Sequence, residues 1–576
     1  MDKITITGKD LTFEDVVKVA YQTAKVELGD LEKVRQSVEF INKKVDENEV
    51  IYGVTTGFGS NADKVIKKED AKKLQINLLR SHSAGVGKNF PKHIVRAIML
   101  IRLNTLLKGY SGVREETLNL LRDFLNYGVH PVIPEQGSVG ASGDLCPLSH
   151  MALALIGEGY VEYNDAEMKT EEFFELPEIK KLKLKPVELS YKEGLGLNNG
   201  TTVMAALGVF AVYDFERLLK LATLSSCLMF EALCVRREAF EEIIHKVRNN
   251  KAQIEVAKWI RKFTKGSTFV GIKSDELKKF APTDDEKRKL LEFEIKKSNL
   301  NEGESLSDAE EAEYEKLKEK QKIGELADKK KIPQDSYSIR CAPQVFGASL
   351  QALWHVKEVI ANEINAAVDN PLIFVEENKV LSGGNFHGQP VALVLDYLKL
   401  AIAEVGNITE RQIAKLVDKN TNDGLPSFLI ENKDGTNSGL MIPQYAAAGL
   451  VSENKVLVHP ASADSIPTCE NTEDHVSMGP IAGRQALEIL ENVKKILSIA
   501  LLAGHHAAAI RQKQFENIGI PAQMAEATKS LFETIKETIP DFKKDEFLEK
   551  DRFLYDDIKQ ILDNYKEFSA MADSLI

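Results

Sequence analysis

The chain has 576 residues, of which 43% are hydrophobic and 28% charged, values typical of a globular protein with a large core. Asp and Glu outnumber Lys and Arg by 87 to 75, and the resulting net charge of -12 argues against nonspecific nucleic-acid binding, which needs a basic surface. The five cysteines form no C-x-x-C pair, which excludes zinc-ribbon and thioredoxin-like functions and favours reduced thiols in a cytoplasmic protein.

The N-terminal part of the chain alternates between helical patterns and irregular loops. The first forty residues are expected to be helical, because Thr12 and Asp15 resemble a capping box before apolar residues at helical spacing. Segments 51–59 and 131–143 are too rich in Gly, Thr and Pro for helices and predict loops. Further helices are predicted at 71–79, 94–107 and 146–156, and short hairpins around Thr5, Val161 and Ile373.

Long helical patterns dominate the chain after residue 200. Helices are predicted over residues 203–235, 347–367, 389–418 and 481–513. Such long apolar helices predict a mainly α fold, an elongated bundle of long helices with a smaller N-terminal domain that carries the loops. We expect this domain at 1–200 and the long-helix bundle domain at 201–576.

Three further segments bear on the organisation of the chain. The apolar stretch from Val203 to Val235 is interrupted by four charged residues, so it predicts a buried helix and no membrane span. The first ten residues lack an apolar core, which predicts no signal peptide. From about residue 265 to 331 the chain is rich in Lys and Glu and predicts exposed helices. A solvated surface insertion is the simpler interpretation of this segment, and an element that binds a partner is the alternative.

The most informative stretch is GSVGASGDLCPLSHM, residues 137–151. It is no nucleophile elbow, because Asp144 stands where that motif needs glycine, and it lacks the G-K-[ST] of a P-loop. The triplet Ala141-Ser142-Gly143 permits a different chemistry. Because Gly143 has no Cβ, its amide nitrogen can approach the Ala141 carbonyl closely, and Ser142 can lose water to leave a methylidene group. The three residues can thus cyclise into an electrophilic imidazolone built from the backbone.

From about residue 10 to about residue 520 the chain resembles the family of histidine and aromatic amino-acid ammonia-lyases, and eight motifs in the order of that family carry the resemblance. They are YGVTTGFG (52–59), SHSAGVG (81–87), GSVGASGDL (137–145), NNGT (198–201), QDSYSIRCAPQ (334–344), DNPL (369–372), GGNFHG (383–388) and EDHVSMG (473–479). The charged segment at 265–331 lies outside the resemblance.

The resemblance implies a prosthetic group and a reaction. In this family the Ala141-Ser142-Gly143 triplet becomes 4-methylideneimidazole-5-one, which activates an amino acid for loss of ammonia without an external cofactor. No metal is implied. The sequence contains no H-E-x-x-H, and the adjacent His505 and His506 would point about 100° apart on a helix, so they are expected to be core or interface residues.

The resemblance also implies roles for single residues. Tyr52 matches the general base toward the β-hydrogen, and a neighbouring positive field would have to lower its pKa from about 10. Arg340 matches the arginine that binds the substrate carboxylate, because its planar group can bind both oxygens. Tyr337 lies three residues earlier, on the same face if the segment is helical. The positions Asn199, Gln334 and Phe386 match residues that orient the substrate or flank the electrophile.

Two positions bear on the substrate. His82 and Glu473 resemble the histidine-specific members, where a carboxylate can accept a hydrogen bond from the substrate imidazole. The resemblance therefore implies elimination of ammonia from L-histidine to give trans-urocanate. An aminomutase, a lyase for tyrosine or phenylalanine, and a non-catalytic scaffold are the alternatives. The chain departs from the family pattern at Asn198, Ser336, Gln389, Glu470 and Thr472, and these departures bear on the identity of the substrate more than on the class of reaction. The intact triplet, Tyr52 and Arg340 argue against the scaffold.

Members of the family assemble as homotetramers whose active sites take residues from three subunits. The long apolar helices fit such an assembly, since a monomer would leave their faces exposed. The resemblance thus implies a homotetramer with shared sites and a small-molecule amino-acid substrate, with no role for nucleic acid or membrane.

Overall fold

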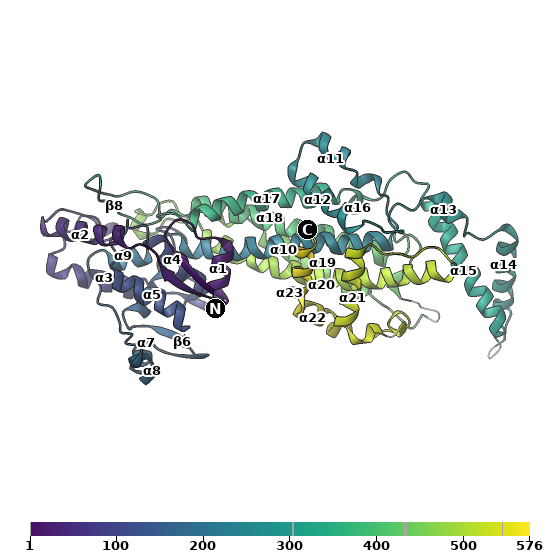
Figure 1. Ribbon diagram of the computed structural model, residues 1–576, viewed down its shortest axis with the longest axis horizontal. Coiled ribbons are helices and arrows are strands. Elements are labelled where there is room, and N and C mark those ends of the chain that lie inside the picture. Colours follow the sequence, from purple (N-terminus) through teal and green to yellow (C-terminus); the bar gives the residue numbers. More distant parts are fainter. Residues whose placement is uncertain (1, 302–304, 431–434, 544) are drawn as a thin grey trace. The chain divides into compact units, whose positions relative to one another are not determined.

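Helices dominate the structure, a computed structural model that describes residues 2–301, 305–430, 435–543 and 545–576 (Figure 1). The mainly α fold predicted from the sequence is confirmed. Contacts divide the chain into two compact units. The first comprises Met1–Tyr213, Trp354–Lys399 and Val458–Glu488, and the second comprises Asp214–Leu353, Leu400–Leu457 and Ile489–Ile576. In the described part of the chain, none of the helices combines the length and apolar character needed to cross a membrane.

Four long helices contribute residues to both units. They are α10 (Thr202–Ala232), α17 (Ala342–Glu363), α18 (Gln389–Val417) and α20 (Gly479–Asn517). All four were predicted from their apolar patterns, with ends that differ from the prediction by at most a few residues. The charges that interrupt the α10 pattern are paired: Lys494 Nζ on α20 lies 3.0 Å from an Asp214 oxygen within the second unit.

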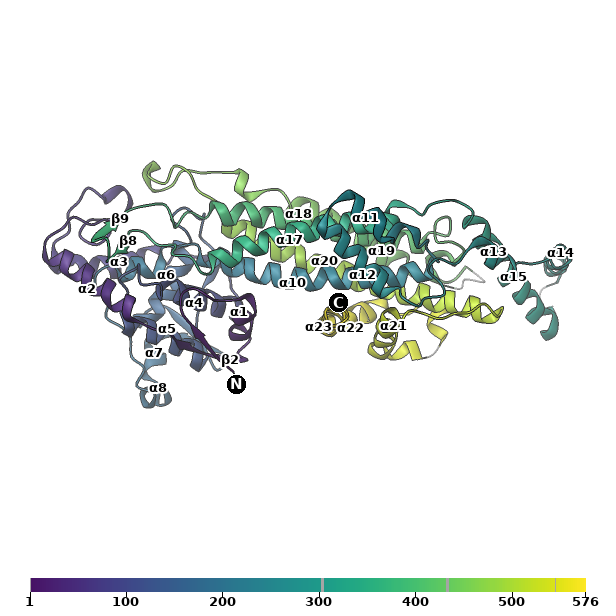
Figure 2. The same cartoon turned by 45° about the horizontal axis from the view of Figure 1, so that its top comes forward.

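The N-terminal segment of the first unit forms a strand, a helix and a second strand. Strand β1 (Asp2–Ile6) pairs in parallel with β2 (Ala24–Leu28), and α1 (Phe13–Ala20) connects them and packs on α4 (Lys92–Leu106), as Figure 2 shows. The expected capping box of Thr12 and Asp15 is present at the start of α1. The expectation that the first forty residues are helical was wrong, because the consecutive β-branched residues Ile4, Thr5 and Ile6 pair with a strand about twenty residues further along the chain.

The part of the first unit that carries the candidate site is built on three helices in mutual contact. They are α3 (Ala71–His82), α6 (Leu145–Leu155) and α9 (Glu193–Asn198). Its other helices are α2 (Glu32–Asp46), α5 (Glu115–Tyr127), α7 (Thr170–Glu175) and α8 (Pro177–Lys181). The remaining strands are β3 (Val86–Asn89), β4 (His130–Pro131), β5 (Pro134–Gln136), β6 (Tyr160–Tyr163), β7 (Ala166–Lys169), β8 (Leu372–Phe374) and β9 (Lys379–Leu381). Of the predicted hairpins, β6–β7 and β8–β9 are confirmed. The hairpin expected around Thr5 is wrong, because the strand that contains Thr5 pairs in parallel with β2.

The second unit adds shorter helices around its share of the long ones. They are α11 (Glu242–Arg248), α12 (Lys251–Phe263), α13 (Ser274–Lys278), α14 (Asp284–Ser298), α15 (Asp308–Lys329), α16 (Tyr337–Arg340), α19 (Met441–Leu457), α21 (Glu526–Thr538), α22 (Leu554–Asp563) and α23 (Tyr565–Ser574). His505 is a core residue of this unit, stacked between Phe532 and Phe542 at centroid distances of 4.2 and 4.5 Å. Burial lowers its pKa, which keeps the ring neutral.

The Lys- and Glu-rich segment forms α13, α14 and α15, and Figure 1 shows α14 and α15 as a helical hairpin. The hairpin has a small core of its own, formed by Leu290, Phe293, Leu306, Tyr314 and Leu317. Ion pairs connect the two helices on the outside, with Lys296 Nζ 2.6 Å from Glu310 and Lys297 Nζ 2.7 Å from Glu311. Such exposed pairs contribute little to stability and keep the surface solvated.

Candidate active site

The Ala141-Ser142-Gly143 triplet lies where two backbone segments cross without room for side chains. Gly143 has φ +72°, and a Cβ built on it would lie 2.3 Å from Gly200 O. Asp144 N donates to the same oxygen at 2.8 Å, and Gly143 and Gly200 form an isolated parallel bridge. Both the left-handed backbone and the close approach require glycine at position 143.

The residues before the triplet are held by the segment that follows Glu473. Ser477 Oγ donates to Gly140 O at 2.9 Å, and Met478 N donates to Val139 O at 2.8 Å. Ala141, which is buried, packs against Val476 and Met478. Two motifs more than 300 residues apart in sequence therefore fix the same turn.

The carbonyl and the hydroxyl of Ser142 are each hydrogen-bonded. Asn199 Nδ2 donates to Ser142 O at 3.0 Å, and Ser142 Oγ donates to Glu473 Oε1 at 2.6 Å. The second carboxylate oxygen of Glu473 accepts from Thr468 Oγ1 at 2.7 Å. Asn199 is almost fully buried at the end of α9, and its Oδ1 has no hydrogen-bond partner in the described part of the chain. These contacts place a carboxylate and an amide on opposite ends of the serine.

Asp144 anchors the other end of the triplet to α10. Its Oδ2 accepts hydrogen bonds from Val203 N at 2.8 Å and Met204 N at 3.0 Å, in the first turn of that helix. Complete burial raises its pKa to about 7, although these backbone donors favour the charged form. The carboxyl group caps the helix N-terminus, where amides have no intrahelical partner.

Tyr52 lies in the loop predicted at 51–59, beside Glu473. Its hydroxyl oxygen accepts from Gly59 N at 3.0 Å, and its ring meets Phe58 edge-on at 6.5 Å. Burial raises the pKa of Tyr52, the Gly59 amide lowers it in part, and the nearby Cys469 and Glu473 raise it further. The positive field expected from the sequence is not among these influences, so the groups around Tyr52 in its own unit favour the neutral phenol.

His82 ends α3 on another wall of the site. Its Nδ1 lies 2.9 Å from Ser81 Oγ, whose own proton goes to Leu78 O at 3.1 Å. The serine oxygen therefore accepts from Nδ1–H, which leaves Nε2 as an acceptor. Burial lowers the pKa of His82, so the ring is neutral near neutral pH.

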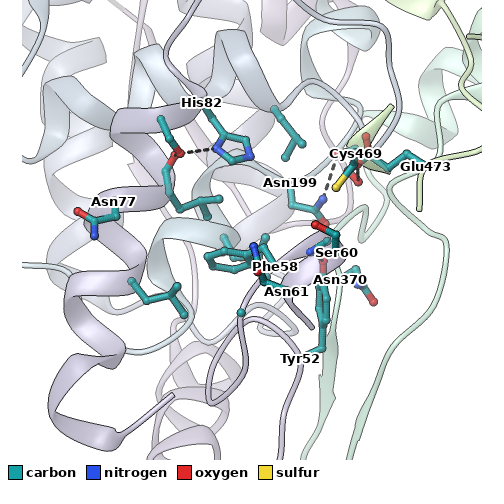
Figure 3. Close-up of a pocket in the computed structure, with 18 of the residues that line it drawn as sticks. Tyr52, Phe58, Ser60, Asn61, Asn77, His82, Asn199, Asn370, Cys469 and Glu473 are labelled. Atoms are coloured by element: carbon teal, nitrogen blue, oxygen red, sulfur yellow. Dashed lines mark hydrogen bonds between the residues drawn. The ribbon is translucent and has the colours of Figure 1, made fainter. Parts of the chain in front are cut away.

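A cavity of about 560 Å³ connects these side chains. Its lining includes six of the residues singled out by sequence analysis, namely Tyr52, His82, Ser142, Asn199, Phe386 and Glu473. Figure 3 shows Tyr52, Asn199, Cys469 and Glu473 close together, with His82 facing the same space from α3. The volume is suited to a small molecule the size of an amino acid with its water.

Sequence analysis assigned no role to several residues at this cavity. Cys469 and Asn370 both line it, and Thr468 binds Glu473. Cys469 begins a turn of three residues with positive φ, which includes Glu470 and Asn471. The departures from the family pattern at 470 and 472 therefore belong to the turn that carries Glu473. No local sequence pattern predicts this arrangement, because the turn depends on contact with the distant loop at 51–59, where Gly59 lies against Cys469.

Three of the predicted residues, Gln334, Tyr337 and Arg340, are in the second unit and do not line this cavity. Tyr337 and Arg340 form the ends of the short helix α16, and the Arg340 guanidinium stacks 4.6 Å from the Tyr337 ring centroid. This confirms that they share a helical face. Tyr337 is 72% exposed, and Gln334, just before α16, is also exposed. Arg340 Nε is buried and has no hydrogen-bond partner among the residues that the structure describes.

Among the described residues, no group of three or more His, Cys, Asp or Glu side chains is arranged to hold a metal ion. The side chains that line the cavity supply a phenol, a carboxylate, an imidazole, amides, the thiol of Cys469 and the ammonium group of Lys64, beside the serine of the triplet.

Comparison with known proteins identifies the family. A model of the aromatic amino acid lyase family matches residues 11–537. The histidine ammonia-lyase of Alkaliphilus oremlandii is 42% identical over 562 residues, which cover 97% of this chain and 96% of that protein.

Solved structures agree in fold. Tyrosine aminomutase from Streptomyces globisporus is 33% identical with a TM-score of 0.82, covering 99% of this chain and 98% of that one. Histidine ammonia-lyase from Trypanosoma cruzi is 32% identical with a TM-score of 0.80, covering 100% and 96%. The chain therefore belongs to the aromatic amino acid lyase family and is a carbon–nitrogen lyase.

Proposed function

We propose that this chain eliminates ammonia from L-histidine to give trans-urocanate, through an electrophile formed from its own Ala141-Ser142-Gly143 backbone. The observation that carries the proposal is the packing of the triplet. Gly143 lies against Gly200 with no space for a side chain, and Ser142 is bound at its carbonyl and its hydroxyl. A turn held in this way favours the approach of a backbone amide to a backbone carbonyl.

The residues fit the 4-methylideneimidazole-5-one group. Ring closure joins Gly143 N to the carbonyl carbon of Ala141 and releases one water, and Ser142 releases a second as its α-hydrogen and hydroxyl. Asn199 Nδ2 would hold the Ser142 carbonyl oxygen, which stays on the ring. When formed, the group supplies an electrophile that activates the amino acid for loss of its amino group, which ordinary side chains cannot do.

Tyr52 is proposed as the base that takes the β-hydrogen of the substrate. Its oxygen accepts from Gly59 N and so keeps its own proton free to leave. Because the surroundings in its own unit raise the pKa of Tyr52, ionisation needs a positive charge from elsewhere. Arg340, proposed to bind the substrate carboxylate, would bring that charge. Tyr337 and Gln334 would enter the cavity on the same segment.

Histidine is the proposed substrate because of His82 and Glu473. Nε2 of His82 is left as an acceptor, and Glu473 offers carboxylate oxygens, so both suit a substrate ring that carries N–H groups. A phenyl ring has no such donor. Full-length relatives at about 42% identity are histidine ammonia-lyases, which supports the same choice.

Arg340, Tyr337 and Gln334 are proposed to reach the cavity from another subunit of a homotetramer, as the family resemblance implies. The exposed Tyr337 supports this assembly, as does the Arg340 Nε, which has no hydrogen-bond partner among the described residues of its own chain. We further propose that the enzyme is cytoplasmic and acts on a free amino acid, without nucleic acid or membrane.

An aminomutase is the second candidate. The specific observation in its favour is the likeness to tyrosine aminomutase from Streptomyces globisporus, with a TM-score of 0.82. An aminomutase would return the ammonia to the β-carbon, so its product keeps the nitrogen. The product therefore separates the two functions.

Ser142→Ala tests the proposed electrophile. The parent protein is expected to weigh less than its sequence mass by two waters, whereas the variant keeps the full mass and loses turnover. Ser226→Ala is the matched control, because Ser226 is buried and bonded to Gln412 in the second unit. It should keep both the mass loss and the turnover. Turnover by Ser142→Ala at the parent rate would refute the proposal, and a parent without dehydration would favour a non-catalytic scaffold.

A further inference from the structure

A buried glutamine joins the loop of Tyr52 to the helix that precedes Asn199. Gln75, on α3, is completely buried and is not part of the cavity lining. Its Nε2 donates to Gly53 O at 3.0 Å, and its Oε1 accepts from Leu195 N at 3.0 Å. Gly53 follows Tyr52 directly, so one side chain connects the base loop with α9.

The backbone packing at this junction is tight. A Cβ on Gly53, which has φ +66°, would lie 2.7 Å from Leu195 Cδ2. A Cβ on Gly194 would lie 2.7 Å from the backbone oxygen of Gln75. The Tyr52 loop, α3 and α9 therefore meet in direct contact, and the Gln75 amide is a polar link inside that contact.

Each of the two hydrogen bonds pairs a backbone group that would otherwise lack a partner within its own element. Leu195 N lies in the first turn of α9, where amides have no intrahelical acceptor. The residue before that helix, Lys192, makes no side-chain capping bond, so Gln75 Oε1 serves as the cap. At the other end Gly53 O is a buried carbonyl, and such a group needs a donor.

The connection continues to the triplet. Leu195 O accepts from Asn199 N at 3.0 Å, and Asn199 Nδ2 donates to Ser142 O at 3.0 Å. Tyr52 and Ser142 are thus joined through Gln75 by a path in which each step is a hydrogen bond or a short run of backbone.

We propose that Gln75 is a positioning residue that sets the distance and angle between the Tyr52 hydroxyl and the Ser142 side of the cavity. The proposal rests on the proposed role of Tyr52 as the base. A base must come within roughly 2.6–3.2 Å of the proton it takes. A displacement of about 1 Å can slow a reaction on the order of 100-fold. Gln75 itself contacts no reacting atom and acts through the loop.

Gln75→Met is the first test, because methionine keeps the length of the side chain but removes both hydrogen bonds. The mass loss of two waters should remain, and KM should change by less than about threefold, while kcat falls roughly 10- to 100-fold. Hydrogen exchange should increase in residues 51–59. Gln253→Met is the matched control. Gln253 is buried on α12 in the second unit, where its Nε2 lies 2.8 Å from His245 Nδ1, and kcat should stay at the parent value.

Gln75→Glu is the second variant. Burial should raise the pKa of the introduced carboxyl group. When protonated, it can still donate to Gly53 O and accept from Leu195 N. When ionised, it cannot donate. The kcat of this variant relative to the parent should therefore recover as the pH falls. Because a buried ionised carboxyl group also lowers stability, the recovery counts for the positioning role only at pH values where circular dichroism shows the variant fully folded.

The outcomes separate the two proposals. Parent-like kcat in Gln75→Met, unchanged exchange in residues 51–59, or a fall in kcat matched by incomplete dehydration would each overturn the positioning role. If the parent itself neither dehydrates nor releases ammonia, the proposed function fails. The exchange comparison between Gln75→Met and Gln253→Met then still decides whether Gln75 holds the Tyr52 loop.

Discussion

The Tyr52 hydroxyl accepts a hydrogen bond from Gly59 N, while burial and the neighbouring Cys469 and Glu473 raise its pKa. The geometry of a base is thus present in this chain, but the charge that would ionise it is not supplied by the groups around it. The motif at 52–59 therefore singles out Tyr52 but does not reveal what controls the pKa of its hydroxyl group. If Tyr52 is the base, as proposed, its ionisation needs a positive charge from outside the groups that set its pKa here.

Removal of the Tyr52 hydroxyl should abolish most turnover and leave the triplet chemistry intact. For Tyr52→Phe we expect the same mass loss of two waters as in the parent and a fall in kcat on the order of 10²- to 10⁴-fold, the usual contribution of a positioned base. In the parent, kcat should rise with pH below the pKa of Tyr52, because only the ionised phenol accepts the proton.

Tyr110→Phe is the control for this variant. Tyr110 packs against Phe374 in the same unit and does not line the cavity. Its variant should keep the parent kcat and pH profile. A Tyr52→Phe enzyme with parent kinetics would remove the proposed base, and one that fails to dehydrate would assign Tyr52 to the formation of the electrophile.

The long helices and the glycine-rich loops were predictable because their signals are local. Helices α10 and α18 follow from long apolar patterns, and the loops at 51–59 and 131–143 follow from their Gly, Thr and Pro content. Strand β2 was missed because its stability comes from distant partners. It pairs with β1, and Val26 N and O are bonded by the side chain of Asn126 on α5.

The candidate site also combines residues that local motifs predict with contacts that depend on distant segments. Tyr52, His82, Ser142, Asn199 and Glu473 could be placed by motif, and the structure brings them to one cavity. The connections between those elements could not be predicted. The crossing of Gly143 and Gly200, the turn at Cys469 and the bridge made by Gln75 each join segments dozens to hundreds of residues apart, and no spacing in the sequence encodes such contacts.

At the scale of the whole molecule, the predicted site residues are divided between the two units. Tyr52 and Ser142 line one cavity of the first unit, whereas Arg340 lies on α16 of the second. Suppose that each cavity takes Tyr52 from one subunit and Arg340 from another. A mixed tetramer of chains that lack Tyr52 and chains that lack Arg340 then contains some cavities in which both residues are present.

Mixed tetramers test this assembly. Chains with Tyr52→Phe and chains with Arg340→Ala, co-expressed with different tags and purified as hybrids, should show activity well above either variant alone. The control hybrid combines Tyr52→Phe with Ser142→Ala, two residues that line the same cavity of one chain, and it should stay inactive. Hybrids of the first kind that show no recovery would contradict sites shared between subunits.

The most direct test of the central claim is to incubate the purified parent protein with L-histidine and to follow urocanate by its ultraviolet absorbance while ammonia is measured in parallel. We predict that urocanate and ammonia appear together in a one-to-one ratio. Tyrosine and phenylalanine, which lack the ring N–H groups that His82 and Glu473 would bind, should give far less product. A product from histidine that keeps its nitrogen would show an aminomutase, and elimination from tyrosine or phenylalanine but not from histidine would contradict the proposed substrate.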